Sequence, residues 1–237
     1  MDLPTKKSVA ETGWPENATW LVYGPPKVGK TTFAAQWPET LILNTEPRGT
    51  RYVDGAYVVD IADRGDLIDA YKTLKAAYDS NKKPPYKTIA IDTIDAPADW
   101  ICKKVMEELN TEAMGQASGG YDWITSRERV ISIIRMFANL PVTLLILAHA
   151  RPIEIEGGKQ GATVDLFKSL ARMVLAECEN ILYCTAEKGK RKIVFAPQSG
   201  IDMGSHHPAL NAAGSCDLSY EALRSLIKDG GEHAVGK

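Results

Sequence analysis

The segment "YGPPKVGKTT", residues 23–32, limits the possible folds of this chain more than any other segment. It places Gly24, Gly29, Lys30 and Thr31 at the spacing G-x-x-x-x-G-K-[ST], which is typical of a loop whose backbone N–H groups enclose phosphates. The apolar run "WLVYG" before the loop predicts a buried strand, and "KTTFAAQW" predicts the helix that follows it. The segment therefore predicts a nucleoside triphosphate site between a strand and a helix.

The residues of this loop have different expected roles. We expect Lys30 to reach the β- and γ-phosphates, Thr31 to ligate Mg²⁺, and Thr32 to lie near the α-phosphate. Lys27 does not occupy the position of the extra signature lysine of the partition-type ATPases, which argues against that class. The residues expected to bind ATP are Gly24, Pro25, Pro26, Lys27, Val28, Gly29, Lys30, Thr31 and Thr32.

Apolar strands alternate with helices as far as His149, a pattern that indicates an α/β fold with a mostly parallel central sheet and helices on both faces. Further strands are predicted at 40–44, 56–61, 88–94 and 142–150, and an antiparallel C-terminal hairpin at 180–186 and 192–196. Helices are predicted at 66–79, 96–109, 122–140, 163–178 and 218–229. We expect Asp66 to cap its helix, and the segments 111–120 and 151–162 to be mobile loops.

These elements divide the chain into an N-terminal arm (1–18), an ATPase core (19–200), and a C-terminal helix with a flexible tail (201–237). The four cysteines form no close pair, so neither a disulfide frame nor a zinc site is expected. No run is long and apolar enough to span a bilayer, which predicts a cytoplasmic protein with no membrane partner. The net charge of -2 argues against a protein that coats duplex DNA by charge alone.

Polar residues end three of the predicted strands, and ligands of parallel sheets bind at that end of the strands. Asp92 closes "TIAID" and is expected to hold the metal through water, unless it caps the next helix, a role that Asp95 could fill instead. Glu46 ends "LILNTE" and either polarises the attacking water or is a solvated strand-end residue. His149 ends "LLILAH" and either contacts the γ-phosphate or bonds to neighbouring backbone.

Basic residues gather at the turn of the predicted hairpin, at Lys188, Lys190, Arg191 and Lys192. Such a run is usually a solvated turn. Alternatively, Lys190, Arg191 and Lys192 form a finger that reaches the nucleotide of a neighbouring copy, since a cation supplied in trans can raise the rate by about 10³ to 10⁵-fold.

The order of these parts resembles the core of the RecA-type recombinases, in which the catalytic glutamate follows the second strand, as Glu46 does here. The segments "GPPKVGKTT", "LNTEPRG", "GGYDW" and "LLILAHARP" are similar to those of the short core-only phage ATPases of this group, which are proposed to be single-strand annealing recombinases. The resemblance covers residues 18–200. It implies a RecA-like ATPase that hydrolyses ATP with Mg²⁺.

The resemblance also implies two DNA-binding loops, at 111–121 and 152–163. The candidate contacts to single-stranded DNA are Tyr121, Trp123, Arg151 and Lys159. The two aromatic rings could bind bases by stacking, or could pack at the start of a helix instead. Glu154 and Glu156 oppose the binding of phosphates to the second loop.

The expected function is therefore that of an ATP-binding and ATP-hydrolysing protein that acts in DNA recombination or single-strand annealing, in the cytoplasm of a bacterial host. Head-to-tail self-association is expected, and a single-strand binding protein is a candidate partner. The alternative is a nucleotide-dependent switch or loader in a replication complex that makes no DNA contact of its own, which the acidic charge balance favours. A small-molecule kinase would need an acceptor pocket and an arginine-rich lid, and the sequence indicates neither.

Overall fold

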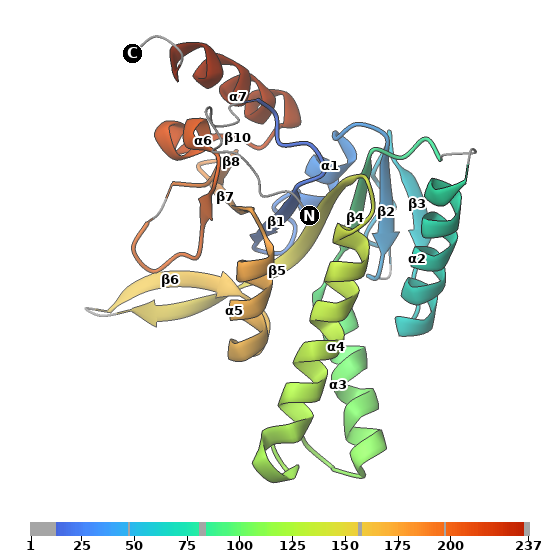
Figure 1. The fold of residues 1–237 in the computed structure, drawn as a ribbon. Coiled ribbons are helices and arrows are strands. Elements are labelled where there is room, and N and C mark those ends of the chain that lie inside the picture. Colours follow the sequence, from blue (N-terminus) through green and yellow to red (C-terminus); the bar gives the residue numbers. More distant parts are fainter. Residues whose placement is uncertain (1–12, 47, 81–83, 156–157, 197, 235–237) are drawn as a thin grey trace, which may run out of the picture.

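One sheet runs through the molecule, and helices cover both of its faces (Figure 1). A computed structural model describes residues 13–46, 48–80, 84–155, 158–196 and 198–234. Within these residues ten strands follow the order β10-β8-β7-β1-β5-β4-β2-β3, with β6 beside β5 and β9 beside β7. The strands are β1 (Thr19–Gly24), β2 (Thr40–Asn44), β3 (Tyr57–Asp60), β4 (Thr88–Asp92), β5 (Thr143–Ile155), β6 (Lys159–Val164), β7 (Asn180–Glu187), β8 (Lys190–Val194), β9 (Gly204–Ser205) and β10 (Ser215–Asp217). The helices are α1 (Lys30–Ala35), α2 (Arg64–Asp79), α3 (Asp95–Leu109), the short η1 (Ser118–Gly120), α4 (Tyr121–Ala138), α5 (Lys168–Glu177), α6 (Pro208–Ala213) and α7 (Tyr220–Ala234).

The central strands of the sheet are parallel. β1 pairs with β5 and β7, β5 pairs with β4, β4 with β2, and β2 with β3. Parallel pairing places the carboxyl ends of these strands along one edge of the sheet, where ligands of such sheets bind. β8 pairs antiparallel with both β7 and β10 and so forms the C-terminal hairpin. The predicted fold class, a mostly parallel α/β sheet with an antiparallel C-terminal hairpin, is confirmed.

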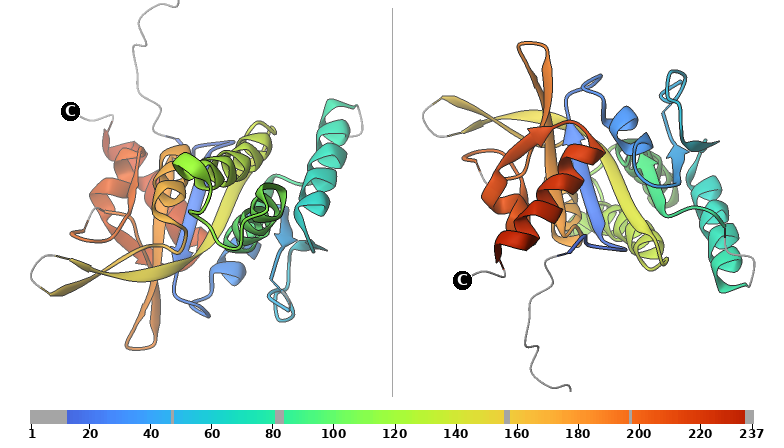
Figure 2. Two further views of the ribbon diagram at one scale, coloured as in Figure 1. Left: turned by 90° about the horizontal axis from the view of Figure 1, so that it is seen from below. Right: turned by 90° about the horizontal axis from the view of Figure 1, so that it is seen from above.

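Alternating side chains build a separate hydrophobic core on each face of the sheet. In β1, Leu21 and Tyr23 pack into the core that α2, α3, α4 and α5 cover, whereas Trp20 and Val22 pack into the core beneath α1, α6 and α7. All four side chains are fully buried. Figure 2 gives two further views of these layers. The strand that leads into the phosphate loop is therefore fixed from both sides.

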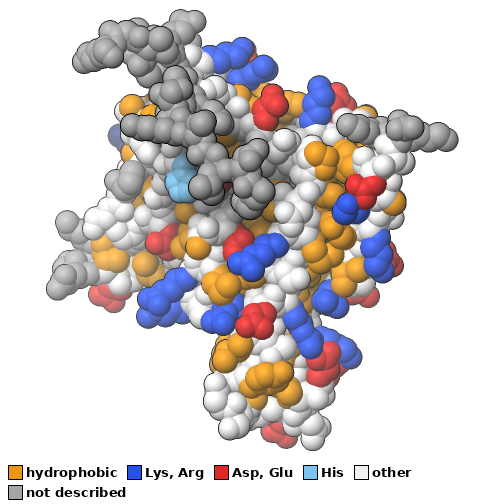
Figure 3. Space-filling model, in the orientation of Figure 1, with side chains coloured by type: hydrophobic (Ala, Val, Ile, Leu, Met, Phe, Trp, Pro, Cys, Tyr) orange, Lys and Arg blue, Asp and Glu red, His pale blue; other side chains and the backbone are white. Residues whose placement is uncertain are grey.

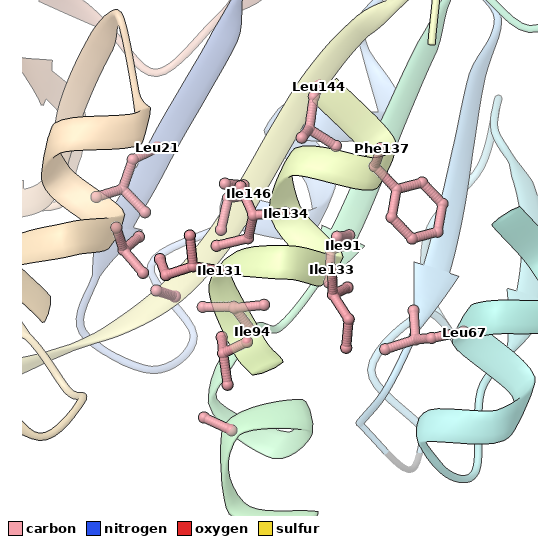
Figure 4. Close-up of a cluster of buried hydrophobic side chains, with 14 of the residues drawn as sticks. Leu21, Leu67, Ile91, Ile94, Ile131, Ile133, Ile134, Phe137, Leu144 and Ile146 are labelled. Atoms are coloured by element: carbon pink, nitrogen blue, oxygen red, sulfur yellow. The ribbon is translucent and has the colours of Figure 1, made fainter. Parts of the chain in front are cut away.

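Helix α4 supplies the centre of the larger core (Figure 4). Its apolar residues recur at three- and four-residue spacing, so that Ile131, Ile134 and Phe137 lie on the face that meets the sheet. Ile91 of β4 and Ile146 of β5 meet them from the sheet side. Because this contact buries large aliphatic groups, it stabilises the two strands that carry Asp92 and His149.

Residues 151–155 and 159–162, predicted to lie in a flexible loop, instead belong to two antiparallel strands that project from the sheet (Figures 1 and 2). β5 continues past its buried part, and β6 pairs with it antiparallel. The alternation in "PIEI" explains the difference: Ile155 packs against Gly200, and Glu154 is exposed. Within the described residues the second predicted DNA-binding segment is thus mainly strand.

The starts of α5 and α2 differ from the predictions for reasons that the structure shows. α5 begins at Lys168 and not at residue 163, because 163–164 belong to β6. In α2 the N-cap is Asp63 and not Asp66: the Asp63 carboxylate accepts a hydrogen bond from the backbone N–H of Asp66 at 3.0 Å. The Asp66 carboxylate accepts instead from the backbone N–H of Ala62 at 2.8 Å. Each aspartate therefore satisfies a free donor at the start of the helix.

The C-terminal segment packs on the smaller core. Leu210 of α6 and Leu223 and Ile227 of α7 are buried there, and α7 extends beyond the predicted end of the last helix. At the other end of the chain, the Trp14 ring stacks on Trp20 with 5.7 Å between ring centroids. Most of the predicted arm lies outside the described residues, and the division of the chain at residues 18 and 200 stays a prediction.

We expect Ile146→Ala to lower the free energy of unfolding by about 2–5 kcal/mol, because truncating a fully buried isoleucine leaves a cavity in the core. Ile124→Ala is the matched control: Ile124 is 39% exposed on α4, and its loss is expected to change the free energy by less than about 0.5 kcal/mol. Urea denaturation followed by circular dichroism measures both. Equal effects would contradict the assignment of Ile146 to the core.

Candidate functional site

The loop between β1 and α1 has a backbone conformation, and a close contact with β7, that require glycine at two positions. Gly29 has a φ of 110°, in the left-handed region that favours glycine. Gly24 lies directly against β7, since a Cβ atom there would stand 2.4 Å from the carbonyl oxygen of Cys184. A larger residue at Gly24 would therefore push the loop off the sheet.

Lys30, the first residue of α1, turns its ammonium group back over the loop. Its Nζ donates hydrogen bonds to the carbonyl oxygens of Gly24 at 3.0 Å and Pro25 at 3.1 Å. Lys30 is buried, and burial lowers the pKa of its ammonium group, while nearby groups that include the Asp92 carboxylate act in the opposite direction. A buried cation that contacts neutral carbonyls fits an anionic ligand, because a ligand charge would offset the loss of solvent.

Asp92 ends β4 beneath the loop and is only 3% exposed. Burial raises the pKa of its carboxyl to about 6, and a hydrogen bond from the Thr31 hydroxyl partly offsets that shift. The Asp92 Oδ2 atom has no hydrogen-bond partner among the described residues. A buried carboxylate oxygen beside a threonine hydroxyl fits a hard cation such as Mg²⁺.

Glu46 follows β2 and is tied to the end of β4. Its Oε1 accepts a hydrogen bond from the Thr93 hydroxyl at 3.0 Å. The adjacent Thr45 donates from its hydroxyl to the Thr93 carbonyl at 2.7 Å and from its backbone N–H to the Asp92 carbonyl at 2.8 Å. These bonds hold the Glu46 carboxylate beside Asp92.

His149 lies opposite Gly24 in the β5–β1 register and is held by Asp95 of α3. The Asp95 carboxylate accepts from the backbone N–H of His149 at 3.1 Å and from its ring Nδ1 at 2.8 Å. This hydrogen bond is the main reason that the pKa of His149 is raised. Asp95 makes no capping hydrogen bond for α3 in the described structure, although the sequence suggested that role for it.

A cluster of possible metal ligands lies beside the aspartate of β4. One carboxylate oxygen each of Glu46 and Asp95 and a ring nitrogen of His149 lie within 4.8 Å of one another. The Nδ1 atom of His149 is already bonded to Asp95, and Glu46 Oε1 lies 3.5 Å from that Nδ1. Hydrogen bonds therefore satisfy this cluster without a metal ion, and Asp92 with Thr31 fits the cation better.

The predicted residues meet in one pocket of about 240 Å³. Lys30 lines it together with Glu46, Asp92 and His149, which the sequence separates widely. The complete lining is Lys27, Gly29, Lys30, Thr31, Thr32, Glu46, Gly49, Tyr52, Val53, Asp92, Thr93, His149 and Arg191. The Glu46 carboxylate and the Lys30 ammonium thus face the same space, as the expected convergence requires.

The basic residues of the C-terminal hairpin do not all lie on one face of β8. Arg191 lines the pocket of its own chain. Because side chains alternate along β8, Lys190 and Lys192 point toward the opposite face of the sheet. A role in trans for these residues stays a prediction.

The candidate DNA-binding residues are spread over two places. Tyr121 begins α4 and is 57% exposed, and the Trp123 ring packs against Phe167 with 4.7 Å between centroids. Arg151 is exposed on the β5–β6 hairpin, and Lys159 is the first residue of β6. Both predicted readings of Trp123 remain open, since it packs on a neighbour and still lines a surface cleft.

That cleft, of about 340 Å³, adds residues that sequence analysis missed. Trp123 and Phe167 line it together with Lys168, Ser169 and Arg172 of α5. Lys168 and Arg172 are four residues apart, so they share one helix face, and that spacing was a visible signal. Figure 3 shows basic side chains next to hydrophobic ones over the region of α4 and α5.

Residues 16–207 match the family model described as an AAA domain. Because the match covers most of the chain, the chain belongs to that family. The family and the mostly parallel sheet agree with the P-loop ATPase fold that the sequence resemblance implied.

Named relatives are distant. The chain is 25% identical over 136 residues to the SPbeta prophage-derived uncharacterized protein YorG of Bacillus subtilis (strain 168), which covers 57% of this chain and 42% of that protein. It therefore spans less than half the length of this curated relative. The KaiC-like protein PH0186 from Pyrococcus horikoshii OT3 is similar in structure, with a TM-score of 0.48 and 18% identity over 77% of this chain and 79% of that chain. A RadB recombinase gives a TM-score of 0.43 and 15% identity over 76% of this chain and 80% of that chain.

None of the helices in the described ranges is both long and apolar enough to cross a membrane.

We expect Asp95→Asn to lower the pKa of His149, because the neutral amide no longer stabilises the imidazolium form. Titrating the histidine side chains by NMR measures the change. The wild-type protein, titrated under the same conditions, is the reference. An unchanged His149 titration would contradict the hydrogen bond as the cause of the raised pKa.

Proposed function

We propose that this protein binds ATP with Mg²⁺, hydrolyses it, and acts on single-stranded DNA as a head-to-tail oligomer in recombination or annealing. The observation that carries the proposal is the meeting of four strand ends at one pocket. The ends of β1, β2, β4 and β5 bring Lys30, Glu46, Asp92 and His149 together, each with a chemistry that a triphosphate site needs.

The phosphates would lie against the loop. There the Lys30 ammonium would exchange its contacts to carbonyl oxygens for contacts to phosphate oxygens. Thr31 and Asp92 would hold Mg²⁺, which supplies charge stabilisation to the phosphates when bound. Because the pKa of Asp92 is raised to about 6, its carboxylate is available to the cation above that pH and is lost as the pH falls below it.

Glu46 would orient the attacking water and accept its proton. Its Oε1 atom is occupied by Thr93, which fixes the carboxylate and leaves Oε2 for water. No other carboxylate lines the pocket among the described residues except Asp92, which is assigned to the metal. His149, held by Asp95 through Nδ1, would present its Nε2 atom to the γ-phosphate.

We expect Glu46→Gln to bind ATP with unchanged affinity and to hydrolyse it at least about 100-fold more slowly, because the amide keeps the shape of the side chain and cannot accept a proton. Lys30→Ala is the companion variant and should lose nucleotide binding itself. Fluorescent-nucleotide binding and phosphate release separate the two effects. Hydrolysis by Glu46→Gln at the wild-type rate would exclude Glu46 as the base.

The cleft of Trp123 and Phe167 supports the DNA-binding part of the proposal. Bases of single-stranded DNA stack on aromatic rings, and basic side chains at the rim contact the phosphates. Lys168 and Arg172 are exposed at this cleft, and Tyr121 offers an exposed ring on the same helix as the half-buried Trp123. A local site of this kind needs no basic protein overall, which agrees with the net charge of -2.

Self-association is supported by the edge strand β3. Among the described strands it pairs only with β2, and its free edge faces solvent. Tyr57, Val58 and Val59 are all exposed there. An apolar, unpaired edge strand is a surface that proteins normally cover, and a second copy of this chain is the proposed cover.

We expect Trp123→Ala and Lys168→Ala each to weaken the binding of a labelled single-stranded oligonucleotide by about tenfold, because stacking contributes about 1–3 kcal/mol per base and a phosphate contact is lost. Lys72→Ala, on the exposed face of α2, is the control and should have no effect. Fluorescence anisotropy with and without ATP, at two salt concentrations, gives the affinities.

The same titration separates the proposal from its rival. ATP-dependent binding that weakens with salt supports the recombinase or annealing function. If the wild-type protein binds no DNA under any condition, the protein is better described as a nucleotide-dependent switch or loader that contacts protein partners. The prophage-derived relative supports a place of action inside a bacterial host for either function.

A further inference from the structure

Arg191 occupies a position that the ATPase proposal leaves unexplained. Its guanidinium lies over the phosphate loop: Nη1 is 3.1 Å from the point where a Cβ atom on Gly29 would stand. It lines the same pocket as Lys30 and Thr31 of the same chain. The contact places a cation of this hairpin beside the phosphate loop of its own chain.

Within the described part of the chain, the charge of Arg191 is not offset by an ion pair. Among the described residues no carboxylate lies within ion-pair distance of its guanidinium, and no hydrogen bond to that group is present. Lys27 and Lys30 also line this pocket, and neither forms an ion pair with a described residue. A guanidinium in this setting fits phosphate oxygens, which it can bind with two parallel hydrogen bonds.

The backbone directs Arg191 toward the loop. Arg191 lies opposite Ala186 in the β7–β8 register, and Ile193, two residues on, is buried in the core under α1. Since side chains two apart in a strand share a face, Arg191 points to the side of α1. The backbone N–H of Leu218 donates to the Arg191 carbonyl at 3.1 Å and fixes that strand position.

The same C-terminal segment also holds the far end of α1. The backbone N–H of Tyr220, at the start of α7, donates to the Gln36 side chain at 3.0 Å, and Gln36 is the C-cap of α1. The Tyr220 ring also packs on Trp37 with 5.1 Å between centroids. The segment from β8 to α7 therefore contacts the phosphate-loop helix at both of its ends.

We propose that Arg191 binds the phosphates of the nucleotide held by its own chain, acting in cis, and so couples nucleotide binding to the C-terminal segment. This inference rests on the proposed ATP binding. Gly29 is needed for this position of Arg191, because a Cβ atom there would crowd the guanidinium. Lys190 and Lys192, on the opposite face of β8, take no part in it.

The first test measures the affinity for fluorescent ADP and for a non-hydrolysable ATP analogue by titration. Arg191→Ala should weaken binding of the ATP analogue by roughly tenfold to a hundredfold, and Arg191→Lys by less, because the charge is kept and the paired hydrogen bonds are lost. Lys72→Ala, which removes an exposed lysine of α2, is the control and should bind as the wild type does. Equal affinity of Arg191→Ala and wild type would overturn the inference.

The second test separates action in cis from action in trans. Lys30→Ala and Arg191→Ala are mixed, and nucleotide binding by the mixture is compared with that of each variant alone. In cis, every chain in the mixture has a damaged site, so binding stays at the mean of the two variants. Binding restored above that mean would show that Arg191 completes a neighbour's site and would overturn the inference. A wild-type protein that binds no nucleotide would overturn the proposed function as well, and thermal unfolding of each variant shows whether the fold is retained.

Discussion

The register of the parallel strands is the constraint on which the candidate site depends. Gly24 of β1 lies opposite His149 of β5, and Asn44 of β2 lies opposite Asp92 of β4. Each polar residue stands at or just beyond the point where its strand leaves the core, so the pairing itself brings the groups together. A slip of one residue in any strand would turn its functional side chain to the other face and its buried apolar residues outward. The two cores therefore preserve the chemistry of the site by preserving the register.

Much of the fold was predictable because its strands are short apolar runs bounded by turns. The segment 40–44 is predicted and observed with the same bounds. The extension of β5 to Ile155 and its partner β6 were not predicted, since the charges and glycines of 151–162 indicate a loop, and only the pairing between the two segments makes them strands. The cap of α2 was assigned to Asp66 because it precedes the apolar repeat, whereas the helix begins earlier with Asp63. Pairing between distant segments and competition between nearby caps are both decided by tertiary structure.

The site was predictable where a residue's spacing or strand end has chemical meaning. Lys30 follows from the loop motif, and Glu46, Asp92 and His149 follow from their places after apolar runs, and all four line one pocket. The role of Asp95 was not visible in the sequence, because its hydrogen bond joins the start of α3 to a strand more than fifty residues later. The position of Arg191 was also not predictable, because a run of basic residues does not show which of their side chains lies on the face of the sheet that α1 covers. Such roles depend on which face of an element meets which neighbour, and that is a property of packing.

The continuity of β5 has a mechanical consequence. The strand that ends its buried part at His149 runs on without a break to Ile155 and is stiffened there by β6. The backbone N–H of Asp165, just after β6, donates to the His149 carbonyl at 2.9 Å and so joins the end of β6 to the point where β5 leaves the core. A small rotation of the peptide at His149 would therefore produce a larger displacement at the far end of the paired strands β5 and β6. A loop of the same length would absorb that rotation close to its origin.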